Sequence, residues 1–593
     1  MDVAARGGVH GVAVGRRVLD ALRRLERLSG RELRAVGTAY AGNDFRDYDT
    51  GADLLVAAVT APVEAGGTEE KEGSDATGGK NETEGADAPG GLSPYEALYL
   101  GLDGDLLRRW AEEAARPLNL AAARALAHSP ASPSPMPPPG RWWAGGGWID
   151  GLSGAGGGGR MVVVGYLTSD LKLSHPIGQL LVPILAGHRR QRFTPVCIDS
   201  HSIGISRSPL PYQQEVQVVN ALGVHVMVNL NGWSGEDRND VLALRPAPLV
   251  INAVGFPGAS GCSFIHALLA DRVSAPPEMA RFFSERLLLL PPSHHPLPQL
   301  HLFGAFDPPA RVTPPGGVAG ISREALGLPP EQGAEGGGVV LASFNRAKKL
   351  DAPTWASWLA ILQSNALSVL WLSRLALSPA AEQRLLASAS AAGVSPDRII
   401  FSDPFPSGEH LAFKSLADLF LDTPGYNAHV TAGDALLAGV PLVVLPRETL
   451  ASRVSASLAF APPAPPPPLA PPRGSAGGGG GGGGGGAHPG VVVARNVEDY
   501  VALTLALVSL PPLVGVRSEK KRKAVRKALL DARESSPLFD VPLWTRSFEA
   551  GLSMALDSLA GLEGSRDGSL APSLPAHLIV SRPPSSLPSG TQL

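Results

Sequence analysis

The chain of 593 residues is poor in cysteine, with only Cys197 and Cys262, and both lie in apolar runs. So few cysteines exclude a disulfide framework and argue against a cysteine-based metal site, which indicates a reducing compartment. A surplus of one charge is also missing, because 51 Lys and Arg face 54 Asp and Glu. We therefore expect no nucleic-acid partner.

Long hydrophobic runs are absent as well. The N-terminal residues lack an apolar core long enough for a secretory signal. The most apolar window, residues 500–516, contains Pro511 and Pro512 and is shorter than the ~20 residues of a membrane span, so we expect a buried helix and no membrane contact. The basic run at residues 520–523 fits a nuclear import signal or a solvated helix face. The predicted location is the nucleus and cytoplasm.

Glycine and proline are abundant, with 70 and 56 copies concentrated in a few blocks. Such blocks bury too little apolar surface to offset chain entropy. They predict a disordered insertion at 64–92, a linker at 128–160, a second linker at 307–338 and a low-complexity insertion at 462–489. Around them we predict helical lead-in segments at 1–63 and 93–127, a first domain at 161–306, a second domain at 339–461, its end together with C-terminal helices at 490–560, and a disordered tail at 561–593.

Short apolar runs alternate with helical patterns inside both predicted domains. Residues 162–169 have the pattern of a buried strand and residues 175–187 that of a helix, and this alternation continues to residue 254. It repeats between residues 339 and 445. The order predicts an α/β fold with two Rossmann-like, doubly wound domains and a shared ligand site at the carboxyl ends of their strands.

The segment 419–441 carries the strongest local signal. A strand ends near Asp422, a loop follows, and a helix is expected from Thr431. A helix N-terminus offers unpaired N–H groups to an anion, His429 adds a donor, and Asp434 could hold ribose hydroxyls. The alternative is a capping box formed by Thr431 and Asp434, which needs no ligand.

Cations and histidines follow other predicted strands. Arg346 and Lys349 come after the strand at 339–344 and either neutralise a diphosphate or are exposed loop residues. His175 begins the helix after the first strand, where it could act on an acceptor hydroxyl or simply cap the helix. His225 lies in an apolar run, where a core histidine is the default. No metal site is predicted, because the Asp pairs at 47/49 and 103/105 follow no nucleotide-binding strand and His294 and His295 lack further ligands.

Taken together, these segments resemble the catalytic region of the O-GlcNAc transferases, including the plant SECRET AGENT type. The resemblance spans roughly residues 35–560 and is carried, in order, by motifs at 164–170, 175–176, 225–232, 238–248, 255–261, 344–351, 368–372, 398–402, 419–441, 448–454 and 535–539, with a lead-in at 45–49 and 95–99. No 34-residue helical repeat is visible before residue 150, so we expect the tetratricopeptide repeats of the family to be missing.

The resemblance implies a GT-B fold, UDP-GlcNAc as donor substrate, protein Ser and Thr as acceptors, and inversion by direct attack without a metal or cofactor. It assigns His175 and His225 to the active site and Lys349 to the leaving diphosphate. The predicted donor contacts are completed by Arg346 at the phosphates, His410 beside the uracil, the phosphate loop of His429, Val430 and Thr431, and Asp434 at the ribose.

Several positions depart from the family pattern. Arg346 stands where the animal enzyme has Gln, Val430 replaces a Thr, Phe413 takes a position that is often Arg, and Gln179 replaces a second His. One extra residue separates Asp170 from His175. Two alternatives therefore stay open, a SPINDLY-like O-fucosyltransferase that uses GDP-fucose and a catalytically weak nucleotide-sugar-binding or scaffold protein.

Overall fold

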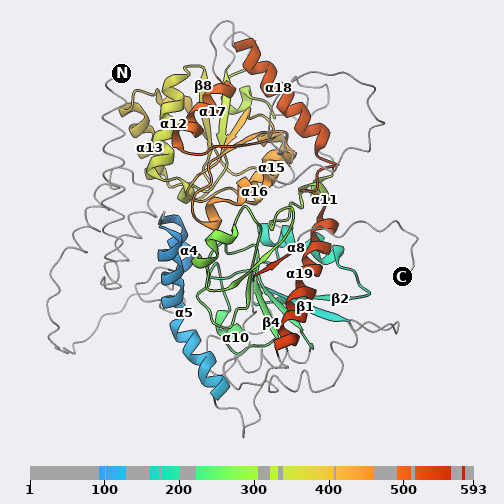
Figure 1. The fold of residues 1–593 in the computed structure, drawn as a ribbon. Coiled ribbons are helices and arrows are strands. Elements are labelled where there is room, and N and C mark those ends of the chain that lie inside the picture. Colours follow the sequence, from blue (N-terminus) through green and yellow to red (C-terminus); the bar gives the residue numbers. More distant parts are fainter. Residues whose placement is uncertain are drawn as a thin grey trace, which may run out of the picture.

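The computed structural model describes twelve stretches of the chain. They are residues 93–100, 102–127, 161–172, 175–200, 219, 222–304, 321–330, 338–406, 409–459, 490–508, 515–562 and 577–580. The predicted lead-in at 1–63, insertion at 64–92, linker at 128–160 and insertion at 462–489 lie outside the described residues. Two lobes meet end to end (Figure 1).

The first lobe contains a seven-stranded parallel sheet in the order β13-β6-β5-β4-β3-β1-β2. Its strands are short and almost continuously apolar, as expected of strands buried on both faces. They are β1 (Val162–Thr168), β2 (Phe193–Asp199), β3 (Val226–Asn229), β4 (Leu249–Asn252), β5 (Ala267–Ala270), β6 (Arg286–Leu289) and β13 (Leu578–Ile579). The helices of this lobe are α8 (Pro176–Gly187), α10 (Asn239–Ala243), η3 (Pro277–Phe282) and α11 (Gln299–Phe303).

The second lobe contains a six-stranded parallel sheet in the order β12-β11-β10-β7-β8-β9. Its strands are β7 (Val339–Ser343), β8 (Ser368–Ser373), β9 (Ile399–Ser402), β10 (Leu419–Leu421), β11 (Leu442–Val444) and β12 (Val491–Val493). Its helices are η4 (Glu324–Leu326), η5 (Ala347–Lys349), α12 (Ala352–Ser364), α13 (Pro379–Ala391), η6 (Pro396–Arg398), α14 (His410–Lys414), α15 (Val430–Leu437), η7 (Leu450–Ser452), α16 (Val454–Ala459), α17 (Val497–Val508) and α18 (Gly515–Ala532). These two parallel sheets with helices confirm the predicted α/β fold class.

A helical segment precedes the first sheet and reaches the junction of the lobes. It consists of α4 (Pro94–Ala97), η2 (Leu98–Leu100) and α5 (Gly104–Ala127). Ser93 and Glu96 form a capping box that starts α4. Helix α5 runs along the first lobe, and α4 lies where the lobes meet (Figure 1).

The C-terminal part of the chain crosses from the second lobe back to the first. Helix α18 contacts α15 and α17, whereas the next helix, α19 (Val541–Leu562), packs against α8 and the core of the first sheet. Of residues 490–560, predicted to hold the end of the second domain and C-terminal helices, α17 and α18 thus lie on the second lobe and α19 on the first. The predicted disordered tail is wrong at residues 577–580, because β13 pairs with β6 there.

Part of the predicted linker at 307–338 belongs to the second lobe. Arg323 is buried and bonds the carboxylate of Asp418 at 2.8 Å and the carbonyl of Leu416 at 2.8 Å. Leu326 and Leu328 pack into the core of the second lobe. The prediction failed because proline and glycine content hid this short apolar anchor.

Residues 500–508 of the most apolar window lie in α17, which is partly buried against α12. In the part of the chain that the structure describes, no helix has both the length and the apolar character needed to cross a membrane. Arg522, within the basic run at 520–523, is buried and donates to the carbonyl of Leu507, so this run is not wholly a solvated face.

Candidate functional site

A buried carboxylate organises the loop between β10 and α15. Asp422 follows β10 and accepts hydrogen bonds from the backbone N–H groups of Thr423 at 2.8 Å and Ala428 at 2.7 Å. Its third donor is the amide of Asn345, at 3.1 Å, from the loop after β7. Burial raises the pKa of Asp422, and these hydrogen bonds oppose the shift. The loop at 422–429 is thereby fixed to the end of β7.

Lys349 enters the same loop from the opposite side. Its ammonium donates to the carbonyl of Asn427 at 2.7 Å and lies 4.3 Å from the centre of the Tyr426 ring. Burial lowers the pKa of Lys349, and the nearby Asp422 carboxylate opposes this. The ammonium is therefore adjacent to the loop that leads into α15, the arrangement on which the predicted diphosphate site depends.

His429 stands at the start of α15 with an unsatisfied ring nitrogen. It occupies the N-cap position without a side-chain capping bond, and its Nε2 is buried without a hydrogen-bond partner. Burial lowers the pKa of His429, and Lys349 lowers it further, so the ring is neutral. A buried polar atom without a partner is costly, so Nε2 is a natural contact point for a ligand.

The capping-box alternative for α15 is wrong. The helix begins at Val430, so Thr431 is its second residue and does not cap it. The first N–H groups of a helix have no acceptor within the helix and carry its positive dipole end. The N-terminus of α15 is thus available to an anion beside His429 and Lys349.

Asp434 is held by side chains from both lobes. It accepts from the ammonium of Lys414 at 2.6 Å and from the amide of Gln299 at 3.1 Å. His410 lies 3.6 Å away and packs edge-on against Phe303. Despite burial, these partners hold the pKa of Asp434 far below its ordinary value. A carboxylate accepts about four hydrogen bonds, so this one keeps capacity for a ribose hydroxyl.

Val430 and Gln299 link helix α15 to the first lobe. The carbonyl of Val430 accepts from the Gln299 amide at 3.0 Å, and the Val430 side chain packs against the core of the first sheet. A hydroxyl at this position would exchange that apolar contact for a polar one. Thr431, the next residue, is partly exposed.

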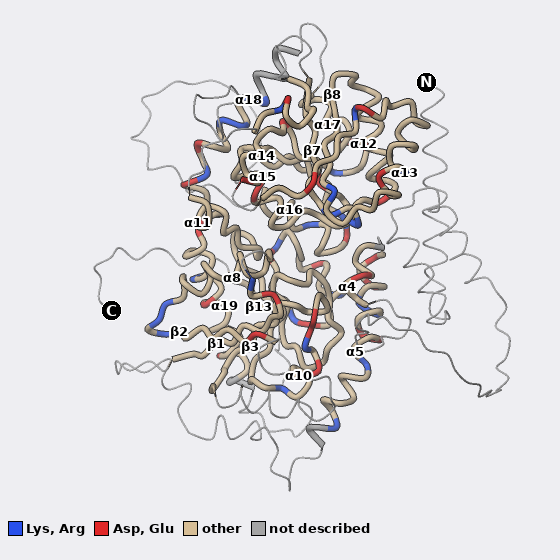
Figure 2. The backbone as a smooth tube through the Cα atoms, turned by 180° about the vertical axis from the view of Figure 1, so that it is seen from behind, with Lys and Arg blue, Asp and Glu red and all other residues tan. Residues whose placement is uncertain are grey.

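Three cations stand close together on the loop after β7. Arg346, Lys348 and Lys349 all act on one another electrostatically, and each cationic neighbour lowers the pKa of Lys349. Lys and Arg segments gather where the lobes meet (Figure 2). The described counter-charges are Asp422 and Glu96, so the loop favours a multiply charged anion.

His175 faces this loop from the first lobe. It caps α8, and its Nδ1 accepts from the N–H of Ile177 at 3.4 Å and lies 3.8 Å from the carboxylate of Asp170. Burial lowers the pKa of His175, Asp170 opposes this, and Arg346 of the second lobe lowers it further. The imidazole therefore lies within electrostatic range of the cationic loop, at the carboxyl end of β1.

His225 does not belong to this site, which corrects its predicted catalytic role. Its Nδ1 accepts from the N–H of Val163 at 2.8 Å, at the amino end of β1. The carboxyl end of β1 is about 17 Å away, at ~3.3 Å per residue. Burial lowers the pKa of His225 to about 4, so it is a neutral core histidine.

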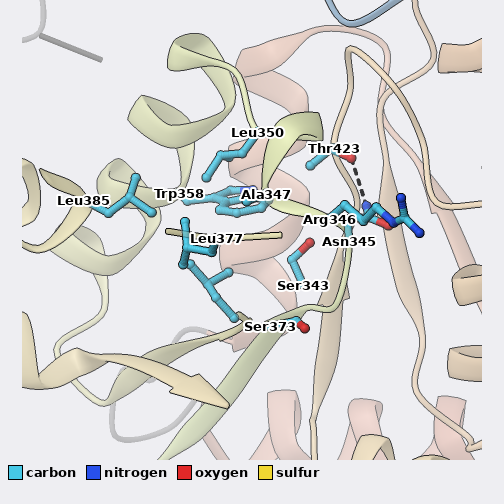
Figure 3. Close-up of a pocket in the computed structure, with 11 residues that line it drawn as sticks. Ser343, Asn345, Arg346, Ala347, Leu350, Trp358, Ser373, Leu377, Leu385 and Thr423 are labelled. Carbon is cyan, nitrogen blue, oxygen red and sulfur yellow. Dashed lines mark hydrogen bonds between the residues drawn. The ribbon is translucent and has the colours of Figure 1, made fainter. Parts of the chain in front are cut away.

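A small pocket of about 20 Å³ lies beside Arg346 at the carboxyl end of β7. Asn345 and Thr423 are hydrogen bonded at its rim, while Leu377 and Leu385 line its apolar side (Figure 3). The Arg346 side chain points away from that apolar side (Figure 3). The described residues that line it include none from α15, so this hollow is separate from the predicted phosphate site.

Residues that could hold a metal ion are few. The described residues contain no group of three or more His, Cys, Asp and Glu side chains placed for a metal. His294 bonds the carboxylate of Asp271 at 2.6 Å, and Asp103 accepts from the N–H of Leu106 at the start of α5. Asp47 and Asp49 lie outside the described residues.

Sequence reasoning missed several side chains of the site. The positive charge of Lys348, in the same motif as Lys349, was one signal. The position of Asp170, two residues after the end of β1, was another. Gln299, Lys414, Tyr99 and Tyr426 gave no such signal, because only the packing of the lobes brings them to the loop.

Comparisons with known proteins agree on one family. The sequence pattern of Glycosyl transferase family 41 matches residues 155–296 and 315–462. Over 411 residues the chain is 29% identical to the probable UDP-N-acetylglucosamine–peptide N-acetylglucosaminyltransferase SEC of Arabidopsis thaliana, covering 66% of this chain and 37% of that protein. Over 414 residues it is 22% identical to the SPINDLY protein of Petunia hybrida, which carries the same probable activity in its name, covering 66% of this chain and 38% of that protein.

A solved structure has the same fold. A mutant O-GlcNAc transferase of Thermobaculum terrenum superposes with a TM-score of 0.54 at 21% identity, covering 78% of this chain and 77% of that one. The chain spans less than two-fifths of the length of the two named plant relatives.

Proposed function

The chain belongs to glycosyl transferase family 41, and from that membership we propose that it transfers N-acetylglucosamine from UDP-GlcNAc to Ser and Thr hydroxyls of intracellular proteins. The observation that carries the proposal is the meeting of Lys349, His429 and the start of α15 in one loop, opposite His175. The plant relatives are named as UDP-N-acetylglucosamine–peptide transferases, which supports this donor and acceptor.

The cationic loop suits a departing diphosphate. When an acceptor oxygen attacks the anomeric carbon, the bond from that carbon to the β-phosphate oxygen breaks, the hydroxyl proton passes to water or to a phosphate oxygen of the departing UDP, and negative charge develops on UDP. We expect Lys349 and the N–H groups of α15, which belong to one loop region, to donate to that charge. Arg346 and Lys348 add positive charge without reorganisation.

The first lobe supplies the acceptor side. His175 is at its edge, and the N–H of Ile177 donates to Nδ1, so the neutral ring carries its proton on Nε2. In that form Nε2 donates a hydrogen bond to the sugar or the acceptor. A single displacement from this side inverts the anomeric carbon.

Side chains of this protein provide the positive charge in this proposal, so a metal ion is not required. Transfer is expected to persist in excess EDTA. Loss of transfer in EDTA that Mg²⁺ or Mn²⁺ restores would contradict the proposed metal independence.

The direct test incubates the full chain with UDP-GlcNAc and a mixed protein extract, and detects N-acetylhexosamine on Ser and Thr by mass spectrometry. Labelling is expected with the wild type and is expected to fall at least about 100-fold in Lys349→Ala, the usual scale for removing a group that stabilises developing charge. Lys527→Ala is the matched control, because that lysine is exposed on α18.

Three results would refute the proposal. Undiminished labelling by Lys349→Ala would reject the leaving-group role. Binding of GDP in preference to UDP, with transfer of fucose from GDP-fucose, would establish the SPINDLY-like alternative. Binding of UDP without transfer or hydrolysis of UDP-GlcNAc would establish the scaffold alternative.

A further inference from the structure

Two tyrosines and a histidine form a stack that joins the helical segment before the first domain to the start of α15. The Tyr99 and Tyr426 rings lie 4.7 Å apart and 5° from parallel. The His429 ring stacks on Tyr426 at 5.1 Å. We call Tyr99, Tyr426 and His429 the aromatic stack. Its members come from η2, from the loop after β10 and from the N-cap of α15.

The aromatic stack is also where two cations of the site are placed. Lys349 lies 4.3 Å from the centre of the Tyr426 ring. Lys348 lies 4.4 Å from the Tyr99 ring centre and 4.9 Å from that of Tyr95. Tyr99 also donates a hydrogen bond to the Tyr95 hydroxyl at 2.9 Å. A cation over an aromatic face is stabilised electrostatically, so the rings fix both ammonium groups.

The tyrosines are anchored on three sides. Tyr426 is buried in a cluster with Leu98 of η2, Phe256 of the first lobe and Ala451 of the second. Tyr95 and Tyr99 pack against the same cluster. A displacement of η2 would therefore move Tyr426, and through Tyr426 it would move His429 and Lys349.

We propose that Tyr99 and Tyr426 are positioning residues of the donor site, which hold His429 and Lys349 in place and keep water from the Lys349 ammonium. This inference rests on the proposed function for its ligand, a nucleoside diphosphate. It adds that a segment outside both α/β domains, residues 94–100, sets the affinity of the site.

The aromatic stack has a consequence for the protonation of Lys349. The titratable and charged groups that face this ammonium are Asp422, Arg346, Lys348, His429 and His295. Burial is the largest cause of its lowered pKa. Removing a ring that covers it admits water, which stabilises the charged form and raises the pKa.

The test compares Tyr99→Leu and Tyr426→Leu with the ring-conserving Tyr99→Phe in the full-length chain. Calorimetry measures UDP binding between pH 7 and pH 10. Each Leu variant is expected to weaken binding at pH 7 about three- to tenfold, the value of one aromatic pair, and to move the loss of binding to higher pH. Tyr99→Phe is expected to match the wild type within about twofold, as is Leu120→Ala, an exposed position on α5.

A second measurement does not need a nucleotide. The rate of Lys349 acylation is followed against pH by peptide mass spectrometry, and its midpoint is expected to rise in each folded Leu variant. Tyr426→Leu removes the ring over Lys349 itself, whereas Tyr99→Leu removes the ring that stacks on Tyr426 and so acts on Lys349 through that stack.

The outcomes separate the two proposals. A wild type that does not bind UDP while the acylation midpoint rises in the Leu variants would refute the proposed function and the ligand assigned here, but support the ring contact. A wild type that binds UDP, with unchanged affinity and acylation midpoint in both folded Leu variants, would overturn the positioning role alone. A Tyr99→Phe variant as weak as Tyr99→Leu would also overturn it.

Discussion

At the scale of single residues, burial decides the protonation of the groups that face the predicted ligand. His175, His429 and Lys349 all have lowered pKa values because burial disfavours their charged forms. His175 and His429 therefore act as neutral hydrogen-bonding groups. Lys349 keeps a charge that depends on its acidic neighbour Asp422 and on any anion that binds.

The rate of transfer should depend on the proton of Lys349. A lowered pKa means that the ammonium is lost at a pH below the ordinary lysine value of 10.5. Transfer is therefore expected to fall as pH rises through that lowered pKa, and kcat/KM measured from pH 6 to pH 10 reports this loss. A profile that stays flat to pH 10 would contradict a required, buried ammonium.

The two predicted catalytic histidines should behave differently. His225→Ala is expected to leave UDP binding and transfer intact but to lower the free energy of unfolding by about 1–3 kcal/mol, because the N–H of Val163 loses its acceptor. His175→Ala is expected to reduce transfer and spare UDP binding. Chemical denaturation and transfer assays on both variants provide the check. A His225→Ala variant that is stable but inactive would support a catalytic role for His225.

At the scale of elements, the site depends on how α11 of the first lobe meets α15 of the second. Gln299 lies flat against Gly433, where a side-chain Cβ would come within 2.7 Å of the Gln299 amide. The absence of a side chain at Gly433 thus lets Gln299 bond both the Val430 carbonyl and Asp434. This contact fixes α15 against the first lobe.

Gly433→Ala is expected to displace Gln299 and weaken this contact. Overpacking of this kind costs about 1–3 kcal/mol. We expect a comparable loss in the free energy of unfolding and weaker UDP binding, measured by denaturation and calorimetry. Ala435→Gly, in the same helix, is the control for helix propensity, and equal UDP binding by wild type and Gly433→Ala would reject the contact as a determinant.

At the scale of the whole molecule, a helix that follows the second lobe in the sequence packs on the first lobe. Helix α19 returns there and places Glu549 in a buried position against α8. Glu549 accepts from the backbone N–H of Arg189 at 2.8 Å and pairs with the side chains of His188 and Arg189. Its carboxylate thereby connects α19 to the C-terminal end of α8.

Glu549→Gln is expected to destabilise the first lobe by about 1–3 kcal/mol, because charge-assisted bonds are replaced by neutral ones. The partners lower the folded pKa of Glu549, so its stabilisation is present above the unfolded pKa and is lost as pH falls through the folded value. The difference in the free energy of unfolding between wild type and variant, measured by urea denaturation, should therefore become smaller at acid pH. An equal difference at pH 7 and pH 3 would contradict stabilisation by the ionised Glu549 carboxylate.

Much of the architecture could be predicted from sequence, because local patterns carry it. Apolar runs of strand length and their alternation with helical patterns specify parallel α/β layers wherever one face of each element must be buried. The loop before α15 and the cations after β7 were found because they follow strand ends. The family was found because its motifs occur in one order.

Other features were decided only by tertiary structure. His175 and His225 differ in environment because one lies at the carboxyl end of β1 and the other at its amino end. The apolar pattern of the sequence does not show at which end of a strand a histidine will lie. The return of α19, the anchoring of residues 321–330 and the stacking of Tyr99 on Tyr426 are contacts between distant segments. Sequence pattern fixes which surfaces must be buried, whereas only the assembled chain determines which partner covers each one.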